Sequence, residues 1–237
     1  MINIGLLGYS GRMGQMIAAE IAENVACALA GGAVQTMKPE YQAGGVLITT
    51  KVAEVIAASD VVMDFTLADA TANHARLAAE HGKPLMCGTT GLDAPAHDAL
   101  KQAAAKIPVL YAANTSLSLV VMKQITALAA RLLPGYDVAI LDEHHIMKKD
   151  APSGTAKALG EAVIQGSGGK LKPDYASVRA GSIIGEHEVI FAGQGETIRL
   201  HHSVTDRRIF ARGAVQAALW LHSKKPGLYG MEDVLSV

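Results

Sequence analysis

The 237-residue sequence has few aromatic residues, no excess of charge of either sign and no long apolar run. Aromatic residues make up 4% of the chain although 50% of it is hydrophobic, so we expect a core of small aliphatic side chains. A formal net charge of −1, without any lysine- or arginine-rich run, argues against a nucleic-acid partner. No run approaches the roughly 18 apolar residues of a membrane helix, which argues against a membrane partner.

Cysteine is scarce as well, and Cys27 and Cys87 each lie in an apolar run without a Cys-x-x-Cys spacing. We expect both to be small core residues and neither a disulfide nor a metal pair, so no metal site is predicted. The first residues, Met1 to Leu7, lack the positively charged segment of a signal peptide and lead directly into a glycine loop. They are predicted to form the first strand of a cytoplasmic protein.

A glycine-rich loop follows this strand, and a helix with an apolar face follows the loop. Strand, glycine loop and helix in this order are the context that a dinucleotide-binding fingerprint requires. Gly8 permits a tight turn and Gly14 lets helix and strand pack closely, although Ser10 stands where the second glycine usually is. A pyrophosphate would lie at the helix N-terminus, where Arg12 adds a positive charge. The predicted cofactor residues of this loop are Gly8, Tyr9, Ser10, Gly11, Arg12 and Met13.

The segment after the second expected strand, Val25 to Ala30, contains no acidic residue between positions 31 and 38. A fold that prefers NADH usually places an acid there to hold the ribose hydroxyls. The missing carboxylate removes the repulsion against a 2′-phosphate, and Lys38 would attract one. We therefore expect NADPH to be accepted, with NADH as a further candidate. The alternative is that Lys38 simply points to solvent.

Three later strands, expected over 60–65, 83–87 and 108–112, alternate with helices over 68–81 and 94–105. This alternation predicts an α/β fold with a Rossmann-type doubly wound parallel sheet. Each strand ends in a polar turn, at the edge where open α/β sheets bind ligands. The turns that should approach the cofactor are Phe65-Thr66, Gly88-Thr89-Thr90 and Ala112-Ala113-Asn114-Thr115.

A long helix over 117–133 and the stop Pro134-Gly135 lead to a smaller α+β unit. A strand over 136–141 and a helix over 155–165 should belong to this unit, and the final helix over 211–222 should return to the first domain. We therefore expect a dinucleotide-binding domain over 1–115 and 208–237, and a substrate-binding and oligomerisation domain over 116–207.

Five histidines outside the central stretch of the chain are expected to have no part in chemistry. His74 and His81 lie on the helix over 68–81 and are read as surface or helix-end residues. The remaining three lie on a hairpin predicted around Gly193-Gln194-Gly195 and are assigned structural or surface roles. These three residues are His187, His201 and His202.

The stretch from Asp142 to Ala156 holds the densest group of reactive side chains. It follows a buried apolar run and ends where Pro152-Ser153 leads into a helix. Imidazole titrates near neutral pH, lysine can donate a proton, and a helix N-terminus suits a carboxylate. A histidine pair on a surface loop is usually only solvated, but a loop after a buried strand of an α/β chain is where sites form. We therefore predict that this stretch is the active site.

This stretch, the loop from Gly8 to Gly14 and the run from Arg179 to His187 together resemble the dihydrodipicolinate reductases. The resemblance extends from Ile4 to Val234, and its most specific part is His-His-x-x-Lys-x-Asp-x-Pro-Ser-Gly-Thr, from His144 to Thr155. It implies reduction of 4-hydroxy-tetrahydrodipicolinate to tetrahydrodipicolinate with NADPH or NADH, in diaminopimelate and lysine biosynthesis. It also implies a homotetramer built through the sheets of the substrate domains.

The resemblance assigns roles to particular residues. It implies that His144 is the catalytic proton donor or acceptor and Lys148 the other proton donor, and Asp142 is a candidate to orient His144. Arg208 beside Arg207 leaves open which arginine approaches the substrate carboxylates. The chain lacks the acid or arginine often found after the second strand in this family, and its segment between Gln165 and Val178 is short. The residues implied in substrate binding are His145, Ser153, Gly154, Thr155, Thr90 and Arg207.

Two other functions are compatible with a two-domain dinucleotide-binding chain. One is an amino-acid or imine dehydrogenase of related build, against which the His-His-x-x-Lys signature argues. The other is a non-catalytic dinucleotide sensor, which would have little need for proton donors at His144 and Lys148. Turnover of NADPH with the substrate separates the sensor from both enzymes.

Overall fold

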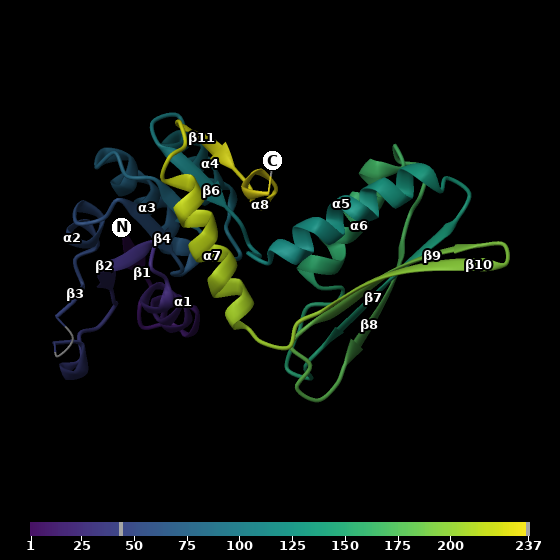
Figure 1. Cartoon of the computed structure of the whole chain (residues 1–237), viewed down its shortest axis with the longest axis horizontal. Helices are drawn as coiled ribbons and strands as arrows, with labels where there is room; N and C mark the ends of the chain where they lie inside the picture. The colour runs from purple at the N-terminus through teal and green to yellow at the C-terminus, as the bar shows by residue number, and fades with distance from the viewer. Residues whose placement is uncertain (43–44, 236–237) are drawn as a thin grey trace. The chain divides into compact units, whose positions relative to one another are not determined.

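The computed structural model describes residues 1–42 and 45–235, and the chain divides into two compact units (Figure 1). Unit 1 comprises Met1–Thr115 and Arg208–Val237, and unit 2 comprises Ser116–Arg207. In the described part of the chain, no helix combines the length and the apolar character needed to cross a membrane.

Unit 1 is built on a seven-stranded sheet in the order β11-β6-β5-β4-β1-β2-β3, and every pair of neighbouring strands in it is parallel. Its central strands are buried along their whole length, because helices cover both faces of a parallel sheet. The order confirms the predicted doubly wound fold. The strands are β1 (Ile2–Leu7), β2 (Cys27–Ala33), β3 (Leu47–Thr49), β4 (Val61–Asp64), β5 (Leu85–Cys87), β6 (Pro108–Tyr111) and β11 (Gly227–Tyr229).

The helices of unit 1 form two groups, since α1 packs against α7 while α3 packs against both α2 and α4. The second group of helices and the sheet enclose a hydrophobic core, and this core contains Cys87. Cys27 is also buried. The burial of both cysteines confirms the prediction that they are core residues. The final helix returns to this unit (yellow in Figure 1). The helices are α1 (Arg12–Glu23), η1 (Pro39–Gln42), α2 (Val52–Ala57), α3 (Ala68–Glu80), α4 (Ala94–Ala104), α7 (Arg208–Leu221) and α8 (Met231–Val234).

The strand order of unit 1 reverses at β1, which pairs with β2 on one side and with β4 on the other. In open α/β sheets the ligand site lies beyond the carboxyl ends of the strands at this switch point. The turns after β1, β4, β5 and β6 all leave the sheet at that edge. The fold therefore gathers the predicted cofactor turns along one border of unit 1.

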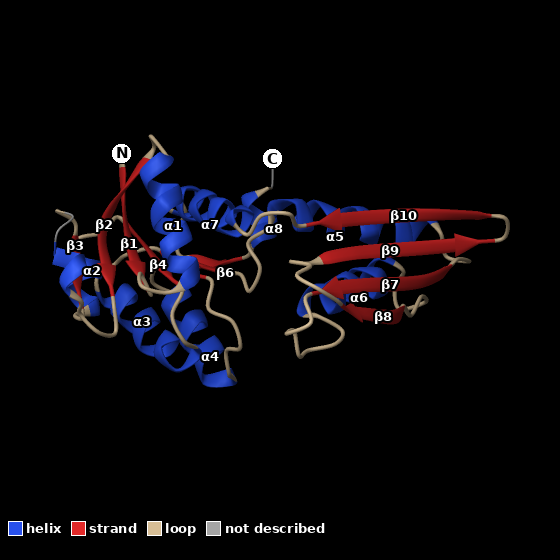
Figure 2. Ribbon diagram, turned by 90° about the horizontal axis from the view of Figure 1, so that it is seen from below, coloured by secondary structure: helices blue, strands red, loops and turns tan. Residues whose placement is uncertain are grey.

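Unit 2 contains a four-stranded sheet in the order β10-β9-β7-β8. Strand β9 is antiparallel to β10 and β7, whereas β7 and β8 are parallel. Figure 2 shows the four strands side by side with the helices behind one face. The core between sheet and helices includes Ile140, Leu159 and Phe191. The elements are α5 (Leu117–Leu132), β7 (Asp137–His144), α6 (Gly154–Gly166), β8 (Asp174–Arg179), β9 (Glu186–Gly193) and β10 (Glu196–Ser203).

Several strand boundaries differ from the prediction. Strand β2 continues through Gly31 and Gly32, beyond the end expected at Ala30. Glycine is needed at position 32, because a side chain there would collide with the ring of Tyr9. Strands β3, β8 and β11 were not predicted. These edge strands are short or largely exposed and lack the apolar alternation that marks a half-buried strand. Strand β7 also continues to His144, three residues beyond the expected end.

Candidate functional site

The extension of β7 changes the position of the predicted active-site residues. Alternate residues of this strand are buried, and the buried set runs from Val138 and Ile140 to Asp142 and His144. The face that begins as hydrophobic core therefore ends in a carboxylate and an imidazole. His144 is the last residue of a strand and not part of a loop, so the sheet backbone holds it in place.

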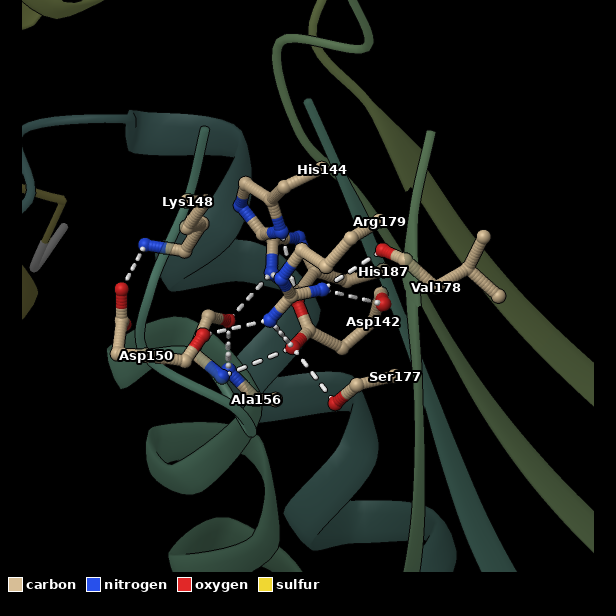
Figure 3. Close-up of polar contacts among 10 residues, drawn as sticks. Asp142, His144, Lys148, Asp150, Ala156, Ser177, Val178, Arg179 and His187 are labelled. Carbon is tan, nitrogen blue, oxygen red and sulfur yellow. Dashed lines mark hydrogen bonds and ion pairs between the residues drawn. The ribbon is translucent and has the colours of Figure 1, made fainter. Parts of the chain in front are cut away.

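The carboxylate of Asp142 is fully buried and lies at the centre of a polar cluster (Figure 3). Its Oδ2 accepts hydrogen bonds from the backbone N–H of Ser153 at 2.8 Å, the guanidinium of Arg179 at 2.9 Å and the hydroxyl of Ser177 at 3.2 Å. Its Oδ1 lies 2.7 Å from Nδ1 of His144 and 3.5 Å from Nε2 of His187. Asp142 thus joins β7, β8, β9 and the start of α6.

Asp142 is ionised in this environment. Burial by itself raises the pKa of a carboxyl, but the hydrogen bonds from Arg179 and Ser153 outweigh it and lower the pKa of Asp142 to about 2. The Arg179 guanidinium also donates to the backbone carbonyls of Asp142 and Asp150, at 3.1 and 2.7 Å. Among the described residues, the hydrogen-bond donors to the Asp142 carboxylate all reach Oδ2, while the buried Oδ1 has only the close contacts of His144 and His187. The charged partner and the donors at Oδ2 tie Asp142 to its neighbours.

The imidazole of His144 is neutral at pH 7, because burial lowers its pKa below the ordinary value of 6.5 despite the nearby carboxylate of Asp142. Its contact with Asp142 is short but poorly aligned for a hydrogen bond. Catalytic hydrogen bonds are often loose before substrate binds. A carboxylate beside Nδ1 favours the tautomer that carries its proton there. The other nitrogen, Nε2, would lie 3.0 Å from a Cβ atom on Gly185, so the glycine leaves room for the ring.

The N-terminus of α6 is tied to the same cluster through Ser153. This residue is the helix N-cap, with its hydroxyl accepting from the backbone N–H of Ala156 at 3.2 Å and lying 3.0 Å from Nε2 of His187. The first turn of the helix contains no acidic residue, and the space in front of Gly154 is open. The dipole and backbone N–H groups of such a helix end favour a carboxylate ligand.

Lys148 lies in the segment between β7 and α6, in a turn closed by its backbone N–H and the carbonyl of His145 at 3.0 Å. Its ammonium lies 2.9 Å from Oδ1 of Asp150, and this hydrogen bond lowers the pKa of Asp150. The Lys148 side chain is 23% exposed, so solvent or a ligand can reach its amine. His145 is half-buried, and the exposed Arg207 lies in the turn before α7.

Sequence reasoning missed Arg179 and His187 as parts of this cluster. We assigned His187 a structural or surface role, but it is buried, and its ring lies 5.1 Å from that of His144. Its pKa is lowered to about 4, chiefly by burial and then by His144. Both residues belong to the run from Arg179 to His187 that carries part of the family resemblance, and this was the available signal.

Unit 1 positions the glycine loop as a dinucleotide requires. Gly8 has a φ of +86°, and a Cβ atom on it would lie 2.5 Å from the carbonyl oxygen of Phe65. A Cβ atom on Gly14 would lie 2.2 Å from the carbonyl oxygen of Gly8. Helix α1 begins at Arg12 without a side-chain cap or an acidic residue in its first turn. The bare backbone and the positive helix end fit the pyrophosphate of a dinucleotide.

The other predicted cofactor turns pack against one another. The Phe65 ring covers Gly88, the backbone N–H of Ala112 donates to the carbonyl of Cys87 at 3.0 Å, and the Thr115 hydroxyl donates to the carbonyl of Phe210 at 2.7 Å. These contacts leave some of the predicted residues open to a ligand. The exposed ones are Ser10, Gly11, Arg12, Thr90 and Ala113, while Tyr9, Met13, Thr66 and Asn114 are half-buried and Thr89 is buried.

Lys38 lies beyond β2 with an exposed side chain. Its ammonium is 3.8 Å from a carboxylate oxygen of Glu40 and 6.0 Å from the ring centre of Tyr41. Tyr41 in turn makes an edge contact with Tyr9 of the glycine loop, at 5.9 Å between ring centres. An acid thus lies just outside the acid-free segment, next to the lysine expected to attract a 2′-phosphate.

Asp142, His144 and His187 also form a group of three possible metal ligands whose donor atoms lie within 4.8 Å of one another. The group has other partners, since Arg179 already compensates the charge of Asp142 and Ser153 faces Nε2 of His187. A guanidinium bonded to the only carboxylate opposes a divalent cation by charge repulsion. We therefore interpret the group as a hydrogen-bonded cluster.

The fold and the two sites define the class of protein. A doubly wound sheet with a glycine loop, joined to a unit that holds a buried aspartate–histidine cluster, is the architecture of a two-domain oxidoreductase that uses a nicotinamide cofactor. The family models "Dihydrodipicolinate reductase, N-terminus" and "Dihydrodipicolinate reductase, C-terminus" match residues 2–115 and 118–235. The chain therefore belongs to the dihydrodipicolinate reductase family.

Similar proteins agree with this assignment. The chain is 43% identical over 235 residues to the 4-hydroxy-tetrahydrodipicolinate reductase of a Xanthomonas campestris strain, covering 99% of this chain and 98% of that protein. It is 38% identical over 256 residues to the Campylobacter curvus enzyme of the same name, covering 100% of both. The fold matches a dipicolinate-bound dihydrodipicolinate reductase from Paenisporosarcina sp. TG-14, with a TM-score of 0.85 at 24% identity, covering 99% of this chain and 100% of that one.

Proposed function

We propose that this chain reduces 4-hydroxy-tetrahydrodipicolinate to tetrahydrodipicolinate with NADPH or NADH, in diaminopimelate and lysine biosynthesis. The observation that carries the proposal is the geometry of the segment from His144 to Thr155. Asp142 joins the imidazole at one end of this segment to the helix N-terminus at the other. A proton-transfer group and an anion site are thus held by one buried carboxylate, as a dicarboxylate substrate requires.

The reaction replaces a hydroxyl group by hydride and releases water, so it consumes one proton. The nicotinamide supplies the hydride. We assign the proton to His144 and Lys148, of which Lys148 has an accessible ammonium and His144 has a neutral imidazole oriented by Asp142. A neutral imidazole can accept a proton and pass it on, while the ammonium can donate one directly.

The substrate carboxylates are assigned to the N-terminal turn of α6. Ser153 holds this turn in position, and Gly154 leaves open space in front of it. Thr155, the half-buried His145 and the exposed Arg207 are proposed as further partners of the carboxylates. Lys148 can add a positive charge to the same anion, because its ammonium has only an exposed aspartate as a described partner.

We further propose that both NADPH and NADH are used. The acid-free segment after β2 does not repel a 2′-phosphate, and Lys38 can attract one. Glu40 beside Lys38 weakens that attraction at the same place. The ratio of kcat/KM for the two cofactors measures the balance, and Glu40→Gln should shift it toward NADPH.

A homotetramer in the cytoplasm is proposed as the working state, formed through the sheets of unit 2. The helices of this unit lie behind one face of the sheet (Figure 2). Glu143 lies on the face of β7 opposite the buried set, and so does Val178, which pairs with it in register. Val178 is 40% exposed. Val178→Glu should dissociate the assembly in light scattering, while Leu128→Glu on the exposed side of α5 should not. Dissociation by Leu128→Glu alone would place the interface on α5.

The reaction itself is tested by the fall in NADPH and NADH absorbance with freshly generated 4-hydroxy-tetrahydrodipicolinate. Rapid oxidation that yields tetrahydrodipicolinate is expected. If both cofactors bind but neither is oxidised, the reductase proposal is wrong. Oxidation with an amino acid or another imine, but not with this substrate, would indicate a related dehydrogenase.

A further inference from the structure

Unit 1 contains a second buried aspartate–histidine pair, which nothing in the proposed mechanism uses. Asp64 is the last residue of β4 and is fully buried, and His74 on α3 is 6% exposed. Nδ1 of His74 lies 2.9 Å from Oδ2 of Asp64. The expectation that His74 is a surface or helix-end residue is wrong. His81, by contrast, is exposed at the end of α3, where Nδ1 lies 2.9 Å from the carbonyl of Leu77.

The other oxygen of Asp64 closes the turn that follows β4. Oδ1 accepts from the backbone N–H of Thr66 at 3.0 Å and from the Thr66 hydroxyl at 2.6 Å. The Thr89 hydroxyl lies 3.4 Å from the backbone carbonyl of Asp64 and 3.5 Å from Oδ1. One buried carboxylate therefore connects the turn after β4 with the turn after β5.

The turn at 65–66 is also the contact point of the glycine loop. The backbone N–H of Phe65 donates to the carbonyl of Leu7 at 3.0 Å, and the backbone N–H of Gly88 donates to the carbonyl of Asp64 at 2.9 Å. The Phe65 carbonyl leaves no room for a side chain on Gly8, and the Phe65 ring leaves none on Gly88. Any movement of Phe65 would therefore disturb the turns after β1 and β5 together.

We propose that Asp64 and His74 are a positioning pair that sets the shape of the cofactor edge of unit 1. The proposal rests on the proposed function, in which this edge binds the nicotinamide cofactor. A buried carboxylate needs its donors, and His74 supplies one from α3 while Thr66 supplies two from the turn. With both in place, the carboxylate holds Phe65 against Gly8 and Gly88. Without His74 the carboxylate loses its tie to the helix, and the turn loses its fixed position.

The test compares cofactor affinity with stability in three variants of the full-length protein. His74→Leu removes the donor, and His74→Asn retains an amide near the position of Nδ1. Ile56→Val shortens a fully buried core residue on α2 of the same unit, and serves as the stability control. The measurements are the Kd for NADPH by fluorescence titration, the KM for NADPH, kcat at saturating cofactor, and the melting temperature.

We expect His74→Leu to raise the Kd and KM for NADPH about tenfold, with kcat changed less than threefold, and His74→Asn to recover most of the affinity. Ile56→Val should lower the melting temperature and leave the Kd unchanged. An unchanged Kd in folded His74→Leu would overturn the inference, as would an equal rise in Ile56→Val. A wild-type protein that binds NADPH but reduces nothing would refute the proposed function and leave this inference standing.

Discussion

The two units each contain a buried aspartate beside the Nδ1 atom of a histidine, at 2.9 Å in the Asp64–His74 pair and 2.7 Å in the Asp142–His144 pair. Their surroundings differ. Among the described residues, the other donors to Asp64 are threonine side chains and a backbone N–H, whereas Asp142 also binds the guanidinium of Arg179. The same pair of side chains is thus proposed to position a turn in one unit and to prepare a proton-transfer group in the other. We attribute the difference between the two proposed roles to the neighbouring charges.

The largest expected effect is a loss of kcat from a change in unit 2 that leaves the KM for NADPH unchanged. Lys148→Met removes the ammonium and keeps the length of the side chain. Loss of a general acid typically costs 10²–10⁴-fold in rate, so kcat should fall by about that factor. The KM for NADPH should stay near the wild-type value, because the residues proposed to bind the cofactor lie in unit 1. Steady-state kinetics measure both, with the exposed neighbour Lys149→Met as control. A KM effect without a kcat effect would remove Lys148 from the proton pathway.

The two aspartates should also differ in their effect on stability. Asp142→Ala leaves the Arg179 guanidinium without its buried partner, and breaking a buried ion pair costs about 3–5 kcal/mol. Asp64→Ala leaves His74 and the Thr66 donors without their partner but strands no guanidinium, and such a loss costs about 1–3 kcal/mol. The exposed Asp98→Ala should change the free energy of unfolding by less than about 0.5 kcal/mol. Urea unfolding at pH 7 measures all three, and equal losses for the two buried aspartates would contradict the comparison.

Low pH should decrease the free energy of unfolding of unit 2, because its buried histidines have lowered pKa values. The folded pKa of His187 is about 4 against an ordinary 6.5, so its contribution is fully present above pH 6.5 and is lost as the pH falls toward 4. At about 1.4 kcal/mol per pH unit, the loss between pH 6.5 and pH 5 is up to about 2 kcal/mol. The lowered pKa of His144 also makes the protein less stable as the pH falls. Protonation of Asp142 removes further stability only between about pH 3.8 and about 2.

His187→Gln tests this assignment, because glutamine retains an amide near Nε2 but does not titrate in this range. The variant should be less stable than wild type at pH 7 and should lose less between pH 6.5 and pH 5. Urea unfolding across that range measures the slope. An unchanged slope would assign the acid sensitivity to other groups.

The smallest expected effect concerns the cap of α6. Ser153→Ala removes the N-cap and the partner of His187, and the loss of a cap costs about 1 kcal/mol. Asp93 caps α4 in unit 1 through the backbone N–H of Ala96, so Asp93→Ala is the matched control. Both variants should lose similar stability, but only Ser153→Ala should raise the KM for the dicarboxylate substrate. Equal KM values would show that the cap of α6 does not position the substrate.

Local patterns explain why much of the fold could be predicted. Buried parallel strands read as apolar runs, and glycine at a turn with positive φ marks the loop after β1. The same reasoning failed for β3 and β8, whose mostly exposed side chains carry no apolar alternation. It also failed at His74, because a histidine on a helix gives no sign of a buried carboxylate on a neighbouring strand.

The sequence by itself determined the family, the doubly wound sheet and the stretch that carries His144 and Lys148, because these depend on motifs and on short-range apolar patterns. Only the tertiary structure decided what surrounds them. Arg179 reaches Asp142 across 37 positions and His74 reaches Asp64 across 10, on elements brought together by strand pairing and helix packing. The partner that sets the charge of a buried carboxylate is chosen by the fold, and no local pattern in the sequence records that choice.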